Sequence, residues 1–261
     1  MNLIADYKQL TKNLAATAKQ VGSQANVKRL TTEYLKRITD VKSIDDFMND
    51  DRVYSYALTA YGLKDMIYAK AFVRKVLTEG VDNPKAFSVR LADSRFREFA
   101  EAFNFARYGS ATTSFDRTQQ GTADRYIRST LEEQAGTQDE RLRLALYFQR
   151  KAPSITGAYG ILADKALYTV VRTALGLPAA ISSSDIDKQA SLIGSKIDVA
   201  DFANSEKLDK FITRFMARAL ADGSGLTGGS TVPAIALMQG VVSNVDSSTL
   251  MKIQTLKRFN A

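Results

Sequence analysis

The sequence predicts an all-α fold, a multihelical bundle with two related halves. Long stretches of the 261-residue chain carry apolar residues at spacings of three and four, the period of a helix that buries one face. Only four prolines occur, at positions 84, 153, 178 and 233. The chain has no convincing run of alternating β-branched residues and no Asn-Gly or Asp-Gly hairpin turn, so no sheet is expected.

The first predicted helix carries a heptad seam interrupted by one threonine. The seam residues are Leu3, Tyr7, Leu10, Leu14, Thr17 and Val21. Three lysines lie outside the seam, and Gly22-Ser23 is expected to end the helix. Because terminal amphipathic helices can pair with another subunit, this seam is a candidate contact surface, although it can equally pack on the chain's own core.

Later helices follow the same periodicity. We expect them at 25–40, 50–61, 65–78, 94–105, 123–135, 138–152, 158–175, 184–194, 205–221, 232–244 and 247–259. Ser43-Ile-Asp-Asp46 has the form of a capping box, and Asp50 is expected to cap the helix that Gly62 ends. Asn83-Pro84 is interpreted as a further helix start.

Two polar stretches separate the helical regions. Residues 107–122 are poor in aliphatic side chains and are predicted to be a surface loop. We therefore divide the chain into an N-terminal half (1–106), this connection (107–122) and a C-terminal half (123–261), packed as one compact unit. The glycine-rich residues 222–230 are predicted to be a flexible loop.

An internal repeat relates the two halves. Residues 27–63 align without a gap with residues 141–177, and eight of these 37 positions are identical, against about two expected from average composition. The identical pairs include Asp50 with Asp164 and Gly62 with Gly176. Each copy is therefore predicted to have a capping Asp at the start of a helix, and a Gly at its end that is followed by an anchoring Leu.

The same blocks resemble a bacterial family. The segments SIDDFMNDDRVYSYALTAYGLKD, LADSRFREFAEAFNF, RLALYFQRKAP and LADKALYTVVRTALGLP are similar to the family called domain of unknown function 1217, over about residues 20–220. The resemblance implies a multihelical fold whose genes often lie near flagellar genes. It implies no catalytic residue and no activity.

Composition excludes several functional classes. The chain has no Cys, no His and no Trp, which removes thiolate nucleophiles, His-dependent triads and imidazole metal ligands. A general base would have to be a carboxylate or lysine with a strongly shifted pKa. We therefore predict that the protein is not an enzyme and has no cofactor.

The chain shows no targeting or membrane signal. No apolar run approaches the roughly 18 residues of a membrane span, and the start MNLIADYKQL lacks the basic residues and apolar block of a secretory signal. We expect a cytoplasmic protein, with export to the flagellum as the alternative.

The net charge of +8 arises from 36 Lys and Arg against 28 Asp and Glu. Its basic residues occur in small pairs with acids interleaved, such as Lys28-Arg29, Lys36-Arg37 and Lys257-Arg258. This pattern is typical of solvated helix faces, and a nucleic-acid surface is the less favoured interpretation.

Four further patterns suggest sites, and each has a structural interpretation that we favour. Gly223 to Gly228 matches G-x-G-x-x-G, but no strand precedes it, so a loop is expected. The acidic cluster at 45, 46, 50 and 51 could bind calcium or magnesium, but helix caps are favoured because it lacks the Gly and late Glu of a calcium loop. Ser182-Ser-Ser-Asp185 and Ser247-Ser248 are expected in turns and caps.

Aromatic residues form the fourth pattern. They are Phe96, Phe99, Phe103 and Phe105 with Tyr54, Tyr56 and Tyr61. Such a group could stack on bases or on a ligand, but its helical spacing favours a core.

We therefore assign no catalytic, cofactor-binding or metal-ligating residue in any of these patterns. The terminal seams are the best functional lead, the second of them formed by apolar residues from Ile235 to Leu256. We predict a non-enzymatic helical protein that acts through protein–protein contacts, with a flagellar component as the candidate partner. Two alternatives stay open: a ligand-binding or enzymatic helical protein that uses carboxylate, Lys or Arg groups, and a weak nucleic-acid binder.

Overall fold

The computed structural model describes residues 3–221, and every regular element in this range is an α-helix or a short 3-10 helix. The predicted all-α fold is confirmed. These residues belong to one compact unit. The predicted glycine-rich loop at 222–230, the helices at 232–244 and 247–259 and the second terminal seam lie outside the described residues.

The N-terminal elements up to the long central helix are short. They are α1 (Leu3–Lys12), α2 (Leu14–Ser23), α3 (Ala25–Ile38), α4 (Ile44–Asn49), α5 (Asp51–Ala60), η1 (Lys64–Met66), α6 (Lys70–Glu79), α7 (Phe87–Arg90), α8 (Ser94–Ala102), α9 (Phe105–Tyr108), η2 (Gly109–Ser114) and η3 (Asp116–Thr118).

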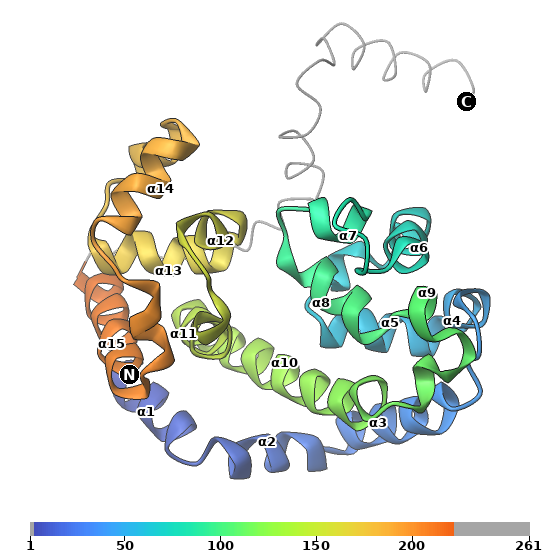
Figure 1. Ribbon diagram of the computed structural model, residues 1–261. Coiled ribbons are helices and arrows are strands. Elements are labelled where there is room, and N and C mark those ends of the chain that lie inside the picture. The colour runs from blue at the N-terminus through green and yellow to red at the C-terminus, as the bar shows by residue number, and fades with distance from the viewer. Residues whose placement is uncertain (1–2, 222–261) are drawn as a thin grey trace, which may run out of the picture. The chain divides into compact units, whose positions relative to one another are not determined.

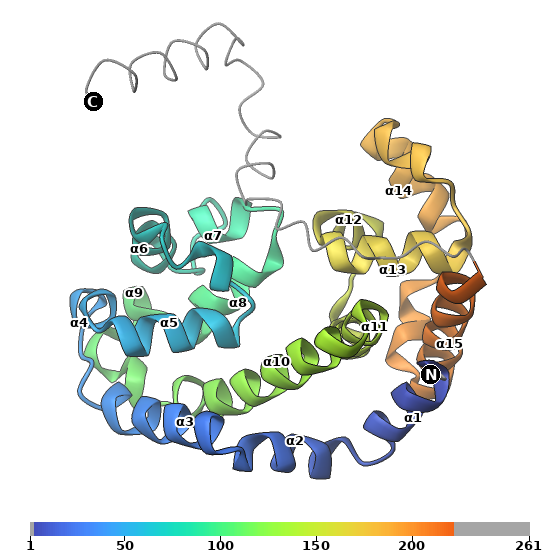
Figure 2. The ribbon, with the colours of Figure 1, turned by 180° about the vertical axis from the view of Figure 1, so that it is seen from behind.

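The central helix α10 spans Gln120–Gln138 and packs against α2, α3, α5 and α11. The elements after it are α11 (Glu140–Lys151), η4 (Ala152–Ser154), α12 (Ala158–Ala163), α13 (Lys165–Leu175), η5 (Ala179–Ser183), α14 (Ile186–Gly194), η6 (Val199–Ala203) and α15 (Ser205–Ala221). Both ribbon views show α1, α2 and α3 following one another along one edge, with α10 beside them (Figures 1 and 2).

Several predicted helices are broken where a local side chain competes for the backbone. The helix expected at 3–21 ends at Lys12, because the side chain of Asn13 accepts a hydrogen bond from the N–H of Ala16 (3.1 Å) and starts α2. The helix expected at 158–175 is divided in the same way by Asp164, whose carboxylate caps α13. Asn83-Pro84 starts a turn, since the Asn83 side chain accepts from the N–H of Lys85 (2.8 Å), and α7 begins only at Phe87.

The polar stretch at 107–122 is not a surface loop. It forms the end of α9, then η2 and η3 and the start of α10, and its side chains Thr112, Thr113, Thr118 and Thr122 are buried. Each threonine hydroxyl donates to a backbone carbonyl, as Thr113 does to Val41 (2.6 Å). The prediction failed because composition reports polarity and not burial, and buried hydroxyls are tolerated when they are hydrogen-bonded. The division into halves at this stretch stays a prediction.

Two stretches of the chain contain the same order of elements. In the first helical segment (residues 25–102), α3 is followed by α4, α5 and α6; in the second helical segment (residues 140–221), α11 is followed by α12, α13 and α14. Helices α4 and α12 both have 6 residues, and α5 and α13 have 10 and 11. The predicted repeat itself stays a prediction, which superposition of the two segments would test.

The predicted caps of α5 and α13 are confirmed. Asp50 Oδ1 accepts from the N–H of Val53 (3.1 Å), and Asp164 Oδ1 accepts from the N–H of Leu167 (3.1 Å). At the other end, Gly62 and Gly176 have φ of +73° and +64°, a region that favours glycine. The residue after each glycine donates back to the helix, over 2.8 Å for Leu63 and 2.9 Å for Leu177.

The two segments have differently composed cores. In the first segment Phe47 lies against Phe99 and Phe103 at ring distances of 6.1 and 5.1 Å. In the second, Phe148, Phe202 and Phe211 pack together among many aliphatic side chains, and Leu3 and Tyr7 of α1 belong to the same core. The N-terminal helix therefore stabilises the second segment, although it precedes the first in sequence.

Candidate functional site

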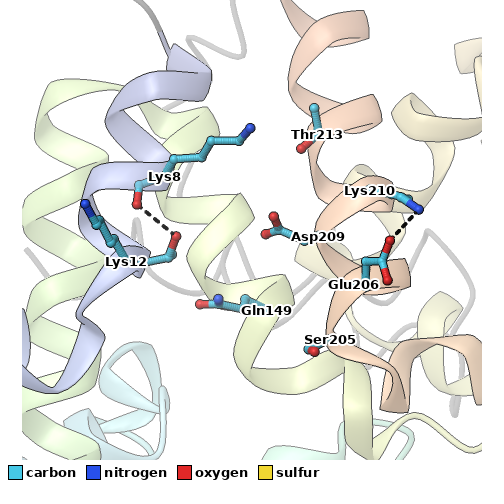
Figure 3. Close-up of a pocket in the computed structure, with 9 residues that line it drawn as sticks. Lys8, Lys12, Gln149, Ser205, Glu206, Asp209, Lys210 and Thr213 are labelled. Atoms are coloured by element: carbon cyan, nitrogen blue, oxygen red, sulfur yellow. Dashed lines mark hydrogen bonds and ion pairs between the residues drawn. The ribbon is translucent and has the colours of Figure 1, made fainter.

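A polar groove lies between α1 and α15, with α11 at its floor (Figure 3). Its volume is about 730 Å³. Lys8 and Lys12 project from consecutive turns of α1, Asp209 and Lys210 come from α15, and Gln149 comes from α11. The packing of Leu3 and Tyr7 into the second segment's core sets the position of the two lysines.

The charges of the groove are mostly paired or open to solvent. Glu206 and Lys210 form an ion pair of 2.7 Å in which both side chains are exposed. The Tyr7 hydroxyl donates to Asp209 Oδ1 (3.3 Å). Burial raises the pKa of Tyr7, and the adjacent Asp209 carboxylate raises it further, so the tyrosine stays protonated and can donate to Asp209. The groove can thus hold a polar or charged molecule through lysines, a carboxylate and an amide.

The acidic cluster is distributed among caps and ion pairs. Asp50 caps α5, and Asp46 accepts the N–H of Lys42 (3.0 Å) beside the Ser43 cap of α4. Asp45 and Asp51 form ion pairs with Arg74 and Lys70 of α6 instead of capping a helix. Throughout residues 3–221, no three or more His, Cys, Asp or Glu residues gather in a way that could hold a metal ion.

Asp50 is the acidic residue of this cluster with the most partners. Its carboxylate accepts from Arg37 Nε (2.8 Å) as well as from the N–H groups of Arg52 and Val53. Partial burial alone would raise the pKa of Asp50, but the hydrogen bond from Arg37 and those from the backbone outweigh burial and hold the pKa below its usual value. This carboxylate is therefore a structural anion and a poor proton acceptor near neutral pH.

The other candidate residues have structural positions. All seven aromatic residues of the predicted group are buried. Ser182 hydrogen-bonds to the Tyr168 hydroxyl (3.0 Å), Ser184 follows η5, and Asp185 caps α14. The residues 223–228, Ser247-Ser248 and Lys257-Arg258 lie outside the described range.

The basic pairs are partly neutralised by neighbouring acids. Arg29 pairs with Glu33 on the next turn of α3 (3.7 Å), and Arg37 pairs with Asp50 (2.8 Å). The larger charge cluster, which the sequence did not suggest, is buried: Glu132 of α10 accepts from Arg128 (3.0 Å) and from Arg150 of α11 (2.7 and 2.8 Å). Glu132 thus ties α10 to α11, where the second segment begins.

An apolar surface at α12 and α14 was also missed. Tyr159 of α12 is 59% exposed and Ile186 of α14 is 56% exposed. The Tyr159 hydroxyl donates to Asp187 Oδ1 (2.7 Å), which places the tyrosine beside the first turn of α14. We call Tyr159, Ile186 and their helices the α12–α14 surface. Periodicity could not find it, because an exposed and a buried isoleucine look the same in a sequence.

No helix within residues 3–221 combines the length and the apolar character that a membrane crossing requires. A family profile described as "Protein of unknown function (DUF1217)" matches residues 60–208. The chain belongs to this family. The predicted resemblance to DUF1217 is thereby confirmed.

The DUF1217 chain is also similar to a solved structure. The X-ray crystal structure of protein AGR_C_984 from Agrobacterium tumefaciens has 42% sequence identity and a TM-score of 0.79, and the match covers 84% of this chain and 93% of that one. The comparison with curated proteins found no match. At this identity the two chains share the family and the fold.

Proposed function

We propose that this DUF1217 protein acts through protein–protein contacts, without catalysis, in association with the bacterial flagellum. One observation carries the contact role: Tyr159 and Ile186 are more than half exposed on two helices that pack against each other. Exposed apolar side chains that gather in one patch mark interaction sites, whereas singly scattered ones do not.

Packing elsewhere supports this choice of surface. Fifty-one hydrophobic residues among those described are buried, and four large ones are exposed: Tyr68, Tyr159, Ile186 and Leu220. Two of the four belong to the α12–α14 surface. The N-terminal seam, which was the sequence-based candidate, buries Leu3 and Tyr7 in the chain's own core and is a weaker lead.

The flagellar association rests on the resemblance to a family whose genes often lie near flagellar genes. The cytoplasm is the compartment we propose, with export to the flagellum as the alternative. Deletion of the gene in its native host should impair motility, and crosslinking in living cells should recover a flagellar component. Normal motility together with recovery of no flagellar component would refute the association.

A polar-ligand role is the second candidate, and the α1–α15 groove favours it. Lys8 extends from α1 toward α15, which carries Asp209, and both residues line about 730 Å³ of open space, so a small molecule with both charges would fit the groove. Thermal-shift screening of charged metabolites against the wild type and the double variant Lys8→Ala, Lys12→Ala tests this role. A ligand that stabilises both proteins equally binds elsewhere.

A further inference from the structure

Helices α6 and α14 occupy the same place in the order of the two helical segments but differ in their surroundings. Helix α6 packs against α4, α7, α8 and α9. On its surface, the Phe72 ring lies 4.9 Å from the Phe87 ring and 5.0 Å from the Phe96 ring. A stretch of chain with two aromatic side chains, residues 87–96, therefore covers this face of α6.

Helix α14 packs principally on α12. In the ribbon, α14 projects beyond α12 and α13 (Figure 1). Ile186 is exposed at its first turn, whereas Phe72, in the first turn of α6, is covered by Phe87 and Phe96. The α12–α14 surface is thus the counterpart of a face that is covered in the first segment.

The stretch that would cover α14 is used elsewhere in the second segment. The element before α15 is η6, and its Phe202 packs against Phe148 and Phe211 at 5.2 and 5.1 Å. In the first segment, α7 precedes α8 in the same way, but its Phe87 packs on α6. The aromatic side chain before the last helix of the segment therefore packs on α6 in the first segment and into the core in the second.

The charged side chains around Ile186 restrict which segments can bind to the α12–α14 surface. Asp185 and Asp187 are exposed on either side of Ile186, and Lys188 follows them, so the rim has two carboxylates and one ammonium. Residues 83–99, which include the stretch 87–96 that covers α6, have four basic and two acidic side chains besides their phenylalanines. A segment of this composition complements both the apolar centre and the acidic rim of the α12–α14 surface.

We propose that the α12–α14 surface docks a segment of a partner protein that presents an aromatic side chain, as Phe87 and Phe96 do for Phe72 of α6, and that carries flanking basic residues, which complement Asp185 and Asp187. The inference rests on the proposed contact function and specifies its surface and the chemistry of its partner. The aromatic side chain packs on Ile186 and Tyr159, and the basic residues face Asp185 and Asp187.

A synthetic peptide with the sequence of residues 83–99 is the probe. Labelled with a fluorophore and titrated with the full chain, it should bind saturably, and Ile186→Ala and Tyr159→Ala should each weaken binding about tenfold, because both remove apolar contact area. Tyr68→Ala is the matched control, since Tyr68 is 68% exposed on the first segment, and it should leave binding unchanged. A peptide with Phe87→Ala should bind about tenfold more weakly than the natural sequence. Addition of 0.5 M salt should weaken the binding of the natural peptide, because salt screens the attraction between its basic residues and the acidic rim.

The absence of saturable binding, or equal binding by all variants, would overturn the proposal. A concentration-dependent dimer that Ile186→Ala abolishes would also overturn it, because the occupant would then be a second copy of the chain. In cells, a flagellar partner that crosslinks equally to the wild type and to the double variant Tyr159→Ala, Ile186→Ala would refute this surface and leave the proposed function standing. Recovery of no partner by the wild type would refute the function itself.

Discussion

The first and second helical segments share an order of helices and differ in what covers them. A capping Asp precedes α5 in the first segment and α13 in the second, and a Gly with positive φ follows each of these helices. Yet α6 is enclosed by α4, α7, α8 and α9, while α14 packs principally on α12. The comparison teaches that local signals set where helices begin and end, whereas the path of the following chain decides which faces stay exposed.

The cores differ as well. The first segment stacks phenylalanines and tyrosines around Phe47, and the second recruits Leu3 and Tyr7 from the N-terminal helix. Helix α1 contacts α11 and α15, so the chain's first helix closes its last described segment. The two segments are therefore expected to unfold together.

The largest expected effect comes from truncating one buried phenylalanine side chain in each of the two cores, in separate variants. Phe99→Ala and Phe211→Ala should each lower the free energy of unfolding by about 3–5 kcal/mol, because both rings are buried and a cavity remains. Far-UV circular dichroism during urea unfolding should show one transition in both variants. Two separate transitions in either variant would break the comparison by showing that the segments are independent.

The next effect concerns the junction between α10 and α11. Glu132→Gln should cost about 3 kcal/mol of unfolding free energy, because it removes the charge that pairs with Arg128 and Arg150 in a site where Glu132 is 4% exposed. Glu206→Gln is the control, since its pair with Lys210 is exposed and should contribute about 0–1 kcal/mol. Equal losses in the two variants would show that the buried cluster has no special role.

A smaller effect sharpens the contrast between α6 and α14. Phe72→Ala should cost about 2 kcal/mol, because its ring packs against Phe87 and Phe96. Ile186→Ala should change stability by less than about 0.5 kcal/mol, since the side chain is 56% exposed. Thermal unfolding of the two variants measures the difference, and a destabilised Ile186→Ala would mean that α14 is covered within the chain.

The smallest effect concerns the two capping residues. Asp50→Ala and Asp164→Ala should each cost about 1 kcal/mol, the usual value for a lost N-cap. A cost near zero in either variant would show that this cap is replaced by solvent.

Asp50 also predicts a pH dependence. Because its pKa is lower in the folded chain than the unfolded value of about 3.9, its contribution to stability is complete above that value and is lost as pH falls through the folded pKa. Asp50→Asn, which can still cap, should therefore flatten the decline of stability below about pH 4. An unchanged decline would assign the acid sensitivity to other carboxylates.

Sequence patterns predicted much of the fold and little of the candidate surfaces. The helix at 205–221 matches α15, because a long periodic stretch with a capping Asn buries one continuous face. The repeat alignment marked Asp164 as a cap, although periodicity alone ran one helix through it at 158–175. The aromatic residues were correctly assigned to the core, but the burial of the threonines at 112–122 was not foreseen.

The sequence by itself determined the helical class, the capping residues and the absence of imidazole and thiol chemistry, because periodicity, caps and composition act over a few residues of chain. Only the tertiary structure decided that α1 packs on α11 and α15, that Glu132 joins two arginines and that Ile186 faces solvent. Each of these depends on which distant element occupies the neighbouring volume, and no short stretch of sequence encodes that neighbour.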